Sequence, residues 1–141
     1  MKNVRILVID GQGGRIGQRL CAELSALEGV TVTAVGTNSA ATQAMLKSGV
    51  SGATGENAIA VNSSRADIIV GPVGIIAANS MLGEITPRAA EAVASSDALR
   101  ILIPSGKCDT RIAGCRDTST GALIESAVEI AKEEIKRLLS E

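Results

Sequence analysis

Apolar and polar positions alternate in blocks along the chain, and the blocks predict strands followed by helices. Residues 4–9 form a largely apolar run, which is typical of a strand buried on both faces. From Gly14 to Leu27 the apolar residues recur at helical spacing, and Gly29 ends that helix. The same alternation predicts further strands at 30–35, 68–70 and 100–103, and further helices at 39–48, 87–95 and 119–139.

Four segments are less regular. Residues 49–57 are predicted as a glycine-rich loop, and 75–82 is a candidate helix. Residues 58–66 are ambiguous between helix and strand, and the strand that follows directly favours a short helix capped by Thr54. Residues 111–115 are a candidate fifth strand, and the short link before it predicts an antiparallel edge strand.

Strands alternating with helices predict an α/β fold. We expect one Rossmann-like domain over residues 1–141, with a doubly wound sheet between two helical layers. The sheet is expected to be mostly parallel, with four or five strands and the antiparallel edge strand as an option.

Three glycine turns follow predicted strand ends. Ligands of such sheets bind beyond the carboxyl ends of the strands, so the turns would converge on one crevice if the first strand lies between the second strand and the one at 68–70. A glycine turn before a helix exposes backbone amides that hold phosphate. The candidate ligand-binding residues are Gly11, Gln12, Gly13, Gly14, Gly36, Thr37, Asn38, Gly71, Pro72 and Gly74.

Each turn also has a purely structural interpretation. The spacing from Gly11 and Gly13 to Gly17 is looser than the dinucleotide-binding GxGxxG pattern, and a tight structural turn would use the same glycines. No carboxylate follows the second strand to hold ribose hydroxyls, which lowers the expectation of NAD or NADP. Thr37 and Asn38 would either bind a second anionic group or cap the next helix.

Asp10, Glu56 and Glu84 are the candidate acid–base residues. Asp10 follows the first strand directly, where it would bind Mg²⁺ through water, hydrogen-bond a sugar, act as a base, or accept local N–H bonds as a cap. Cys108 lies beside Lys107, which lowers the pKa of some thiols, although an ordinary reduced cysteine is the simpler interpretation.

Composition excludes several classes of function. The chain has 141 residues, a net charge of −1, no histidine and no aromatic residue. A basic stripe and base-stacking aromatics are therefore missing, as are the usual histidine bases and ligands, so we expect no nucleic-acid partner and no metal site. The chain has no apolar run of about 18 residues, so no membrane span is predicted. Three cysteines without a signal-peptide pattern favour a cytoplasmic location.

Five motifs in order resemble a family of small bacterial Rossmann-like proteins catalogued as a domain of unknown function. They lie at residues 9–14, 36–42, 52–58, 71–75 and 78–87, so the resemblance covers nearly the whole chain. It implies a cytoplasmic Rossmann-like protein and no particular activity. The chain departs from the family at Arg15, where the family has glycine, and at Asp109, where its cysteine-containing segment has asparagine.

A weaker likeness connects the chain to methylglyoxal-synthase-type domains. Gly36-Thr37-Asn38 and the turn at 71–74 stand where that family has a phosphate-binding turn and a later Gly-Pro-x-Gly turn. The histidine and Gly-Gly-Asp elements of its lyase chemistry are missing here. The likeness therefore implies binding of a small phosphorylated ligand only.

Three hypotheses remain. The first is a protein that binds a nucleotide, a dinucleotide or another phosphorylated metabolite at the glycine turns. The second is a small NAD(P)-dependent oxidoreductase or phosphate-ester lyase. The third is a structural protein without ligand, whose turns are only turns. A homo-oligomer is expected under each, because a small Rossmann unit often completes its surface by association.

Overall fold

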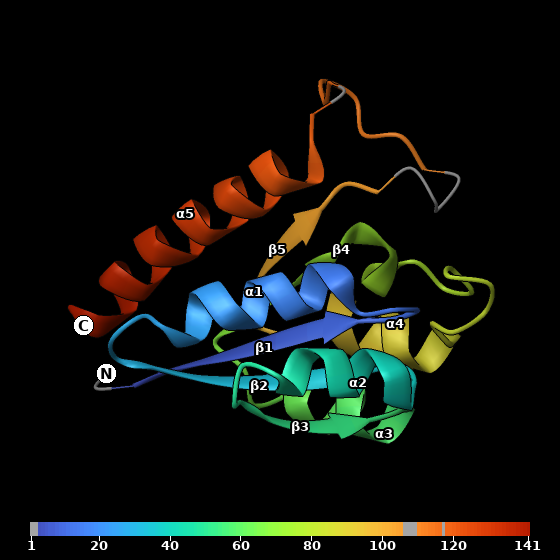
Figure 1. Cartoon of the computed structure of the whole chain (residues 1–141), viewed down its shortest axis with the longest axis horizontal. Helices are drawn as coiled ribbons and strands as arrows, with labels where there is room; N and C mark the ends of the chain where they lie inside the picture. The colour runs from blue at the N-terminus through green and yellow to red at the C-terminus, as the bar shows by residue number, and fades with distance from the viewer. Residues whose placement is uncertain (1–2, 106–109, 117) are drawn as a thin grey trace.

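The computed structural model describes residues 3–105, 110–116 and 118–141. One sheet runs through it in the order β3-β2-β1-β4-β5, and all four neighbouring pairs are parallel (Figure 1). The strands are β1 (Val4–Asp10), β2 (Val30–Gly36), β3 (Ser51–Thr54), β4 (Ile68–Pro72) and β5 (Leu99–Ile103).

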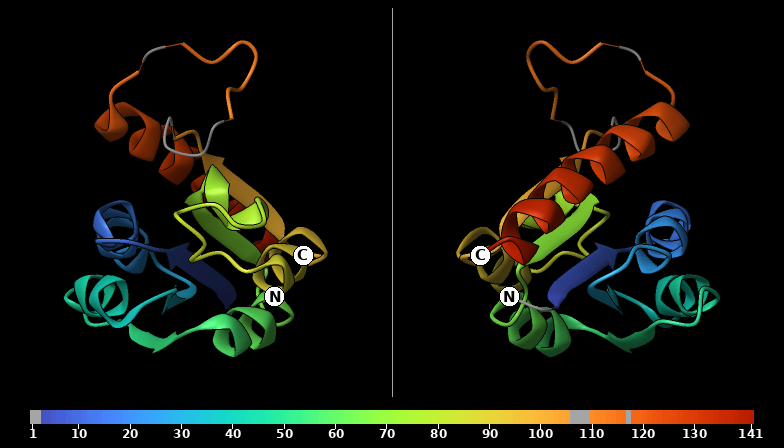
Figure 2. Two further views of the ribbon diagram at one scale, coloured as in Figure 1. Left: turned by 90° about the vertical axis from the view of Figure 1, so that its right-hand side faces the viewer. Right: turned by 90° about the vertical axis from the view of Figure 1, so that its left-hand side faces the viewer.

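Helices cover both faces of this sheet, so the predicted three layers are present. Figure 2 shows α1 and α2 on one side of β1 and α4 on the other. The described helices are α1 (Arg15–Ser25), α2 (Ser39–Leu46), α3 (Glu56–Ser63), α4 (Pro87–Ala94) and α5 (Thr120–Leu139), together with a single 3-10 turn, η1 (Val73–Ile76).

The two faces of β1 pack into two separate aliphatic cores. Ile6 and Val8 belong to the larger core, to which α1, α2 and α5 contribute. Leu7 and Ile9 point the other way and pack with residues of α3, η1 and α4. A parallel strand covered by helices on both faces must be apolar on both, which explains the nearly unbroken run at 4–9.

The strand order reverses at β1, which lies between β2 and β4. This is the arrangement that brings the turns after β1, β2 and β4 to one end of the sheet, and it gives the chain a Rossmann-like α/β fold. The predicted fold class is confirmed.

The predicted antiparallel edge strand is wrong. Residues 111–115 form turn and irregular structure. The additional strand is β3, which lies inside the segment predicted as a loop. All four residues of β3 are exposed and none is a large apolar residue, so hydrophobic periodicity gives no signal for it. Its backbone pairs in parallel with β2, from Thr33–Ser51 to Gly36–Thr54.

Two other segments differ in detail. The short helix favoured at 58–66 is present as α3, but it begins at Glu56 after Gly55, whose φ is 106°. Thr54 does not cap it, and its hydroxyl instead lies 2.7 Å from the hydroxyl of Thr42. Of the candidate helix at 75–82, only the end of η1 is helical, and turns follow.

Three helices begin at a capping side chain, and the capping interpretation of Asn38 is confirmed. The side chains of Asn38, Thr86 and Ser119 each accept a hydrogen bond from the backbone amide three residues later, at Ala41, Ala89 and Ala122. Such caps satisfy amides that the first turn of a helix leaves without a partner. These starts are readable in sequence because each depends on neighbouring residues alone.

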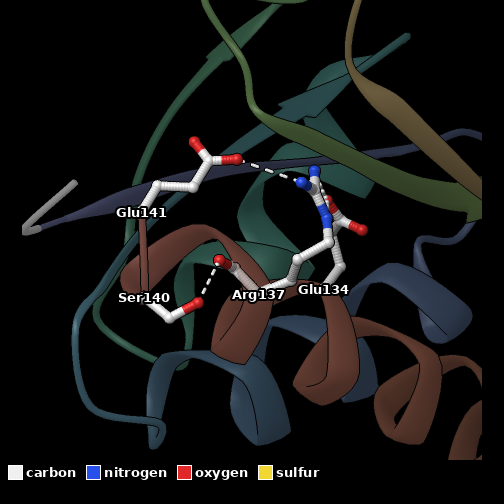
Figure 3. A network of polar contacts seen from close by, with 4 residues as sticks. All are labelled: Glu134, Arg137, Ser140 and Glu141. Atoms are coloured by element: carbon white, nitrogen blue, oxygen red, sulfur yellow. Dashed lines mark hydrogen bonds and ion pairs between the residues drawn. The ribbon is translucent and has the colours of Figure 1, made fainter.

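The end of α5 carries a small exposed charge network (Figure 3). The guanidinium of Arg137 bonds to Glu134 one turn earlier and to Glu141, 3.0 Å away, and the Ser140 hydroxyl donates to the Arg137 carbonyl. Exposed pairs of this kind contribute little to stability.

No helix of the described residues has the length and apolar character that crossing a membrane requires.

Gly71→Ala is expected to destabilise the sheet. A Cβ at this position would stand 2.3 Å from the carbonyl oxygen of Ile9 on the neighbouring strand. Overpacking against backbone typically costs about 1–3 kcal/mol, which denaturant unfolding followed by circular dichroism would measure. Gly13→Ala is the matched control, because a Cβ there meets no atom within 4 Å. Equal unfolding midpoints for the two variants would contradict this account.

Candidate functional site

A loop of four residues, 11–14, joins the carboxyl end of β1 to α1. The amide of Gly14 donates to the carbonyl of Gly11 at 2.9 Å, which closes the turn. Gly14 has a φ of 70°, and a Cβ on it would lie 2.8 Å from backbone atoms of Ala41 in α2. Gly14 is therefore required twice, for its backbone conformation and for the close approach of α2.

Asp10 fixes this loop from inside. Its side chain is only 5% exposed, and its two oxygens accept from the amides of Gly11 at 2.8 Å and Gly17 at 2.7 Å. Burial raises the pKa of the Asp10 carboxyl, and the nearby charge of Glu84 raises it further. The two amide hydrogen bonds lower this pKa, but the net pKa lies above its ordinary value. This is the geometry of the capping interpretation.

A cavity of about 560 Å³ opens beside the loop. Its walls come from the glycine loop, the first turn of α1, the ends of β4 and β5, and the start of α5. The described lining residues are Asp10, Gly11, Gln12, Gly13, Gly14, Arg15, Ile16, Pro72, Met81, Pro104, Ser105, Thr118, Thr120 and Leu123.

Three backbone amides of residues that line this cavity have no acceptor among the described residues. No described residue accepts a hydrogen bond from the amides of Gly13, Arg15 or Ile16. The Arg15 side chain is exposed on the cavity wall and forms no ion pair with a described residue. A cation in the first turn of a helix opposes the helix dipole, and an anion bound nearby would reverse that penalty.

A second helix start lies on the opposite wall. Thr118 and Thr120 flank Ser119, the N-cap of α5, and both line the cavity. Arg19 of α1 reaches the same helix start, since a Cβ on Gly121 would stand 3.4 Å from its guanidinium. The amino ends of α1 and α5, which are 11 and 20 residues long, therefore bound one cavity.

Glu84 lies between the glycine loop and the turn after β2. Its Oε1 accepts from the Gln12 amide at 2.9 Å, the Thr37 hydroxyl at 2.5 Å and the Asn38 side-chain amide at 2.9 Å. Partial burial raises the pKa of Glu84, but these hydrogen bonds lower it by more, and the net pKa lies below its ordinary value of 4.5.

The predicted ligand-binding residues divide into two groups. Gly11, Gln12, Gly13, Gly14 and Pro72 line the cavity, whereas Gly36, Thr37, Asn38, Gly71 and Gly74 do not. Asn38 caps α2 and also donates to the Gln12 carbonyl at 3.0 Å. Gly71 packs against Ile9, and the Gly74 carbonyl accepts from Ser80, so both have structural roles.

The three candidate acid–base residues are not brought together at the cavity. Asp10 lines it, Glu84 lies behind Gly11, and Glu56 lies at the start of α3. Glu56 accepts from the Thr86 hydroxyl and pairs with Arg88 at 3.3 Å; the first of these contacts contributes most to a lowered pKa. In this structure Glu56 ties α3 to α4.

The described residues contain no candidate metal centre. They contain no group of three or more acidic or cysteine side chains that could hold a metal ion. Cys108 lies outside the described residues, so the hypothesis about its reactivity stays a prediction. Cys21 is fully buried in the core, and burial raises the pKa of its thiol to about 12.

Sequence reasoning missed the α5 wall and the segment that carries Met81. The end of β5 was recognisable, and the rule that ligands lie beyond the carboxyl ends of parallel strands would have added Pro104 and Ser105. The start of α5 lies a further fifteen positions along the chain, and no local signal connects it to the loop.

Glu84→Gln is expected to remove an acid-sensitive contribution to stability. A carboxyl whose folded pKa is lowered stabilises the fold above its unfolded pKa, near 4.5, and this contribution disappears as the pH falls through the folded pKa. The gap in thermal midpoint between wild type and Glu84→Gln should therefore be largest near neutral pH and shrink below about pH 4.5.

Thermal unfolding across that pH range tests this, with Glu91→Gln on α4 as the matched control for charge. The gap for Glu84→Gln should exceed that for Glu91→Gln at neutral pH. A gap that stays constant from neutral pH to pH 3 would contradict the assignment.

Two solved structures are similar to the chain over most of its length, and one family model matches it. Over 92% of its length the chain is similar to a dodecameric FMN-dependent UbiX-like decarboxylase from Escherichia coli O157:H7, at 17% identity, 75% coverage of that chain and a TM-score of 0.43. Over 93% it is similar to a nucleoside-diphosphate-sugar epimerase from Pseudomonas aeruginosa, at 16% identity and a TM-score of 0.42, and it spans about half (48%) of that chain. No curated protein matches the chain. The family model described as Domain of unknown function (DUF3842) matches residues 5–136, and the protein therefore belongs to the DUF3842 family.

Proposed function

We propose that this protein binds a nucleotide or another phosphorylated metabolite in the cavity beside the glycine loop. The observation that carries the proposal is Gly13. Its φ is outside the left-handed region and a Cβ on it would meet no atom within 4 Å, so the fold does not require glycine there. Gly13 nevertheless lines the cavity. The absence of a side chain keeps the space in front of the backbone amides open.

The donors around that space suit a phosphate group. The amides of Gly13, Arg15 and Ile16 have no described acceptor, and helix starts with free amides bind anions. The guanidinium of Arg15 adds a full positive charge with several donors. The start of α5 contributes a second dipole directed at the same cavity.

The remaining wall suits the organic part of such a ligand. Ile16, Pro72, Met81 and Leu123 give it an apolar character, and Ser105, Thr118 and Thr120 add polar groups. Small-molecule sites are commonly cavities of about 300–1,000 Å³ with this mixture of linings. At about 560 Å³ the cavity falls within that range.

Asp10 sets a condition on the bound state. Its carboxylate lies on the cavity wall, where a charged phosphate would be repelled. Both of its oxygens accept hydrogen bonds from backbone amides, which offset part of that charge.

The wider expectations from the sequence stay predictions. They are a single domain over residues 1–141, a cytoplasmic location and a homo-oligomer. Catalysis by Asp10, Glu56 or Glu84 likewise stays a hypothesis. Of the three, Asp10 lines the cavity and the other two do not.

Gly13→Leu is expected to block the ligand without unfolding the protein. The added side chain projects into open space, so the stability change should stay within about 0.5 kcal/mol, as for other exposed substitutions. A thermal-shift screen of inorganic phosphate, mononucleotides, dinucleotides and sugar phosphates should find a ligand for the wild type. Ligand at 100 times its Kd stabilises by about 2.7 kcal/mol, and Gly13→Leu should lose that shift.

Arg15→Gln separates charge from shape in the same assay. It keeps most of the side chain and removes the cation, so affinity should fall by about tenfold, or ~1.4 kcal/mol. Arg65→Gln, on an exposed residue after α3, serves as the control and should change little. The absence of any phosphorylated ligand in the screen would contradict the proposed function and favour a structural role.

A further inference from the structure

We infer that Glu84 is a specificity-determining residue that closes the half of the crevice next to β2, so that the site takes a ligand with one phosphorylated end, of mononucleotide type, and rejects dinucleotides. This inference rests on the proposed function. It names the class of ligand and a residue that selects it.

The crevice is open on one side of β1 and filled on the other. In doubly wound sheets a dinucleotide spans the switch point, with one half beyond each of the strands that flank β1. Here the cavity beside the loop is lined from the ends of β4 and β5 and the start of α5, and no described residue of the turn after β2 lines it. The side of β2 is occupied by Glu84, whose carboxylate lies against the loop end of that strand, at Thr37 and Asn38.

Glu84 also consumes the donors that a second ligand half would need. Three groups converge on its Oε1: the amide of Gln12, the hydroxyl of Thr37 and the side-chain amide of Asn38. An anionic group of a ligand would compete for the same three donors. In this structure a carboxylate of the protein itself takes the place of that group.

Contacts at Gly11 show how tightly this half is filled. A Cβ on Gly11 would stand 2.6 Å from the Met81 sulfur, 2.8 Å from the Thr37 hydroxyl and 3.0 Å from Oε1 of Glu84. Gly11 is itself buried. A methyl group there would force these side chains to shift, so a nucleoside beyond β2 would have to displace the side chains of Met81 and Glu84.

That segment is anchored to the fold at both ends. The Ser80 hydroxyl donates to the Gly74 carbonyl at 2.6 Å, and Ile85 is completely buried. Backbone hydrogen bonds cross the segment between Asn79 and Ile85 in one direction and between Ile85 and Ser80 in the other. These contacts make it a wall of the site.

The backbone conformation of the wall supports a specific role. Asn79, Met81 and Leu82 all have positive φ, between 56° and 66°, although none is glycine. Such conformations are unfavourable and persist only where the surroundings impose them, often at ligand sites. The result of this arrangement is to aim Met81 at Gly11 and Glu84 at the loop amide of Gln12.

Paired ligands that share one half provide the test. Calorimetric titration of FMN against FAD and of nicotinamide mononucleotide against NAD gives an affinity ratio for each pair. For the pair that binds, the wild type should prefer the mononucleotide by at least about tenfold. Glu84→Ala should lower that ratio severalfold, because it frees three donors and opens the space. Glu91→Gln, on α4, is the control and should leave the ratio unchanged.

Glu84→Gln keeps the acceptor oxygen and the size but removes the charge, so it should lower the ratio less than Glu84→Ala. It decides the matter if Glu84→Ala does not fold. Equal affinity of the wild type for both members of a pair, or ratios unaffected in both Glu84 variants, would overturn this inference while the proposed function stands. Failure of mononucleotides, dinucleotides, sugar phosphates and inorganic phosphate alike to bind would overturn the proposed function, and this inference with it.

Discussion

The hydrogen bonds of the Asp10 carboxylate are the interaction on which the end of the sheet depends. One oxygen holds the first amide of the glycine loop, and the other holds the Gly17 amide in the first turn of α1. The Asp10 carbonyl also accepts from the Thr37 amide at 3.1 Å, which joins the turn after β2 to the same residue. Because α1 has no capping side chain at Gly14, this buried carboxylate serves in its place. The helix, the loop and the neighbouring turn are thus positioned by a single residue.

The features predicted correctly from sequence depend on short stretches of chain. The apolar run of β1 and the threonine cap of α4 are each encoded in a few adjacent residues. Gly29, which was expected to end α1, lies four residues beyond the end of that helix at Ser25. The position of β1 between β2 and β4 was only a condition at the sequence level, and the strand order meets it. Five motifs in order were also sufficient to identify the family, which the match over residues 5–136 shows.

The features that were missed depend on contacts between distant residues or on the backbone alone. β3 is an edge strand of small exposed residues, so it is stabilised by pairing with β2 and leaves no apolar pattern. Glu84 is separated from Gln12 by 72 positions and from Asn38 by 46, and a lone glutamate in a polar segment carries no sign of such partners. A carboxylate does lie beside the turn after β2, but it comes from the segment after β4 and already accepts hydrogen bonds from Gln12, Thr37 and Asn38.

The two edges of the sheet have a consequence for how copies of this protein can meet. An unpaired edge is a template for another strand, and short or charged edges discourage such growth. β3 offers four residues, and on the opposite edge Arg100 of β5 directs its guanidinium back to the carbonyls of Ser96 and Ala98. Both edge strands are short, and β5 carries Arg100 among its apolar residues. Both outermost strands are therefore poor templates for pairing with a strand of another copy.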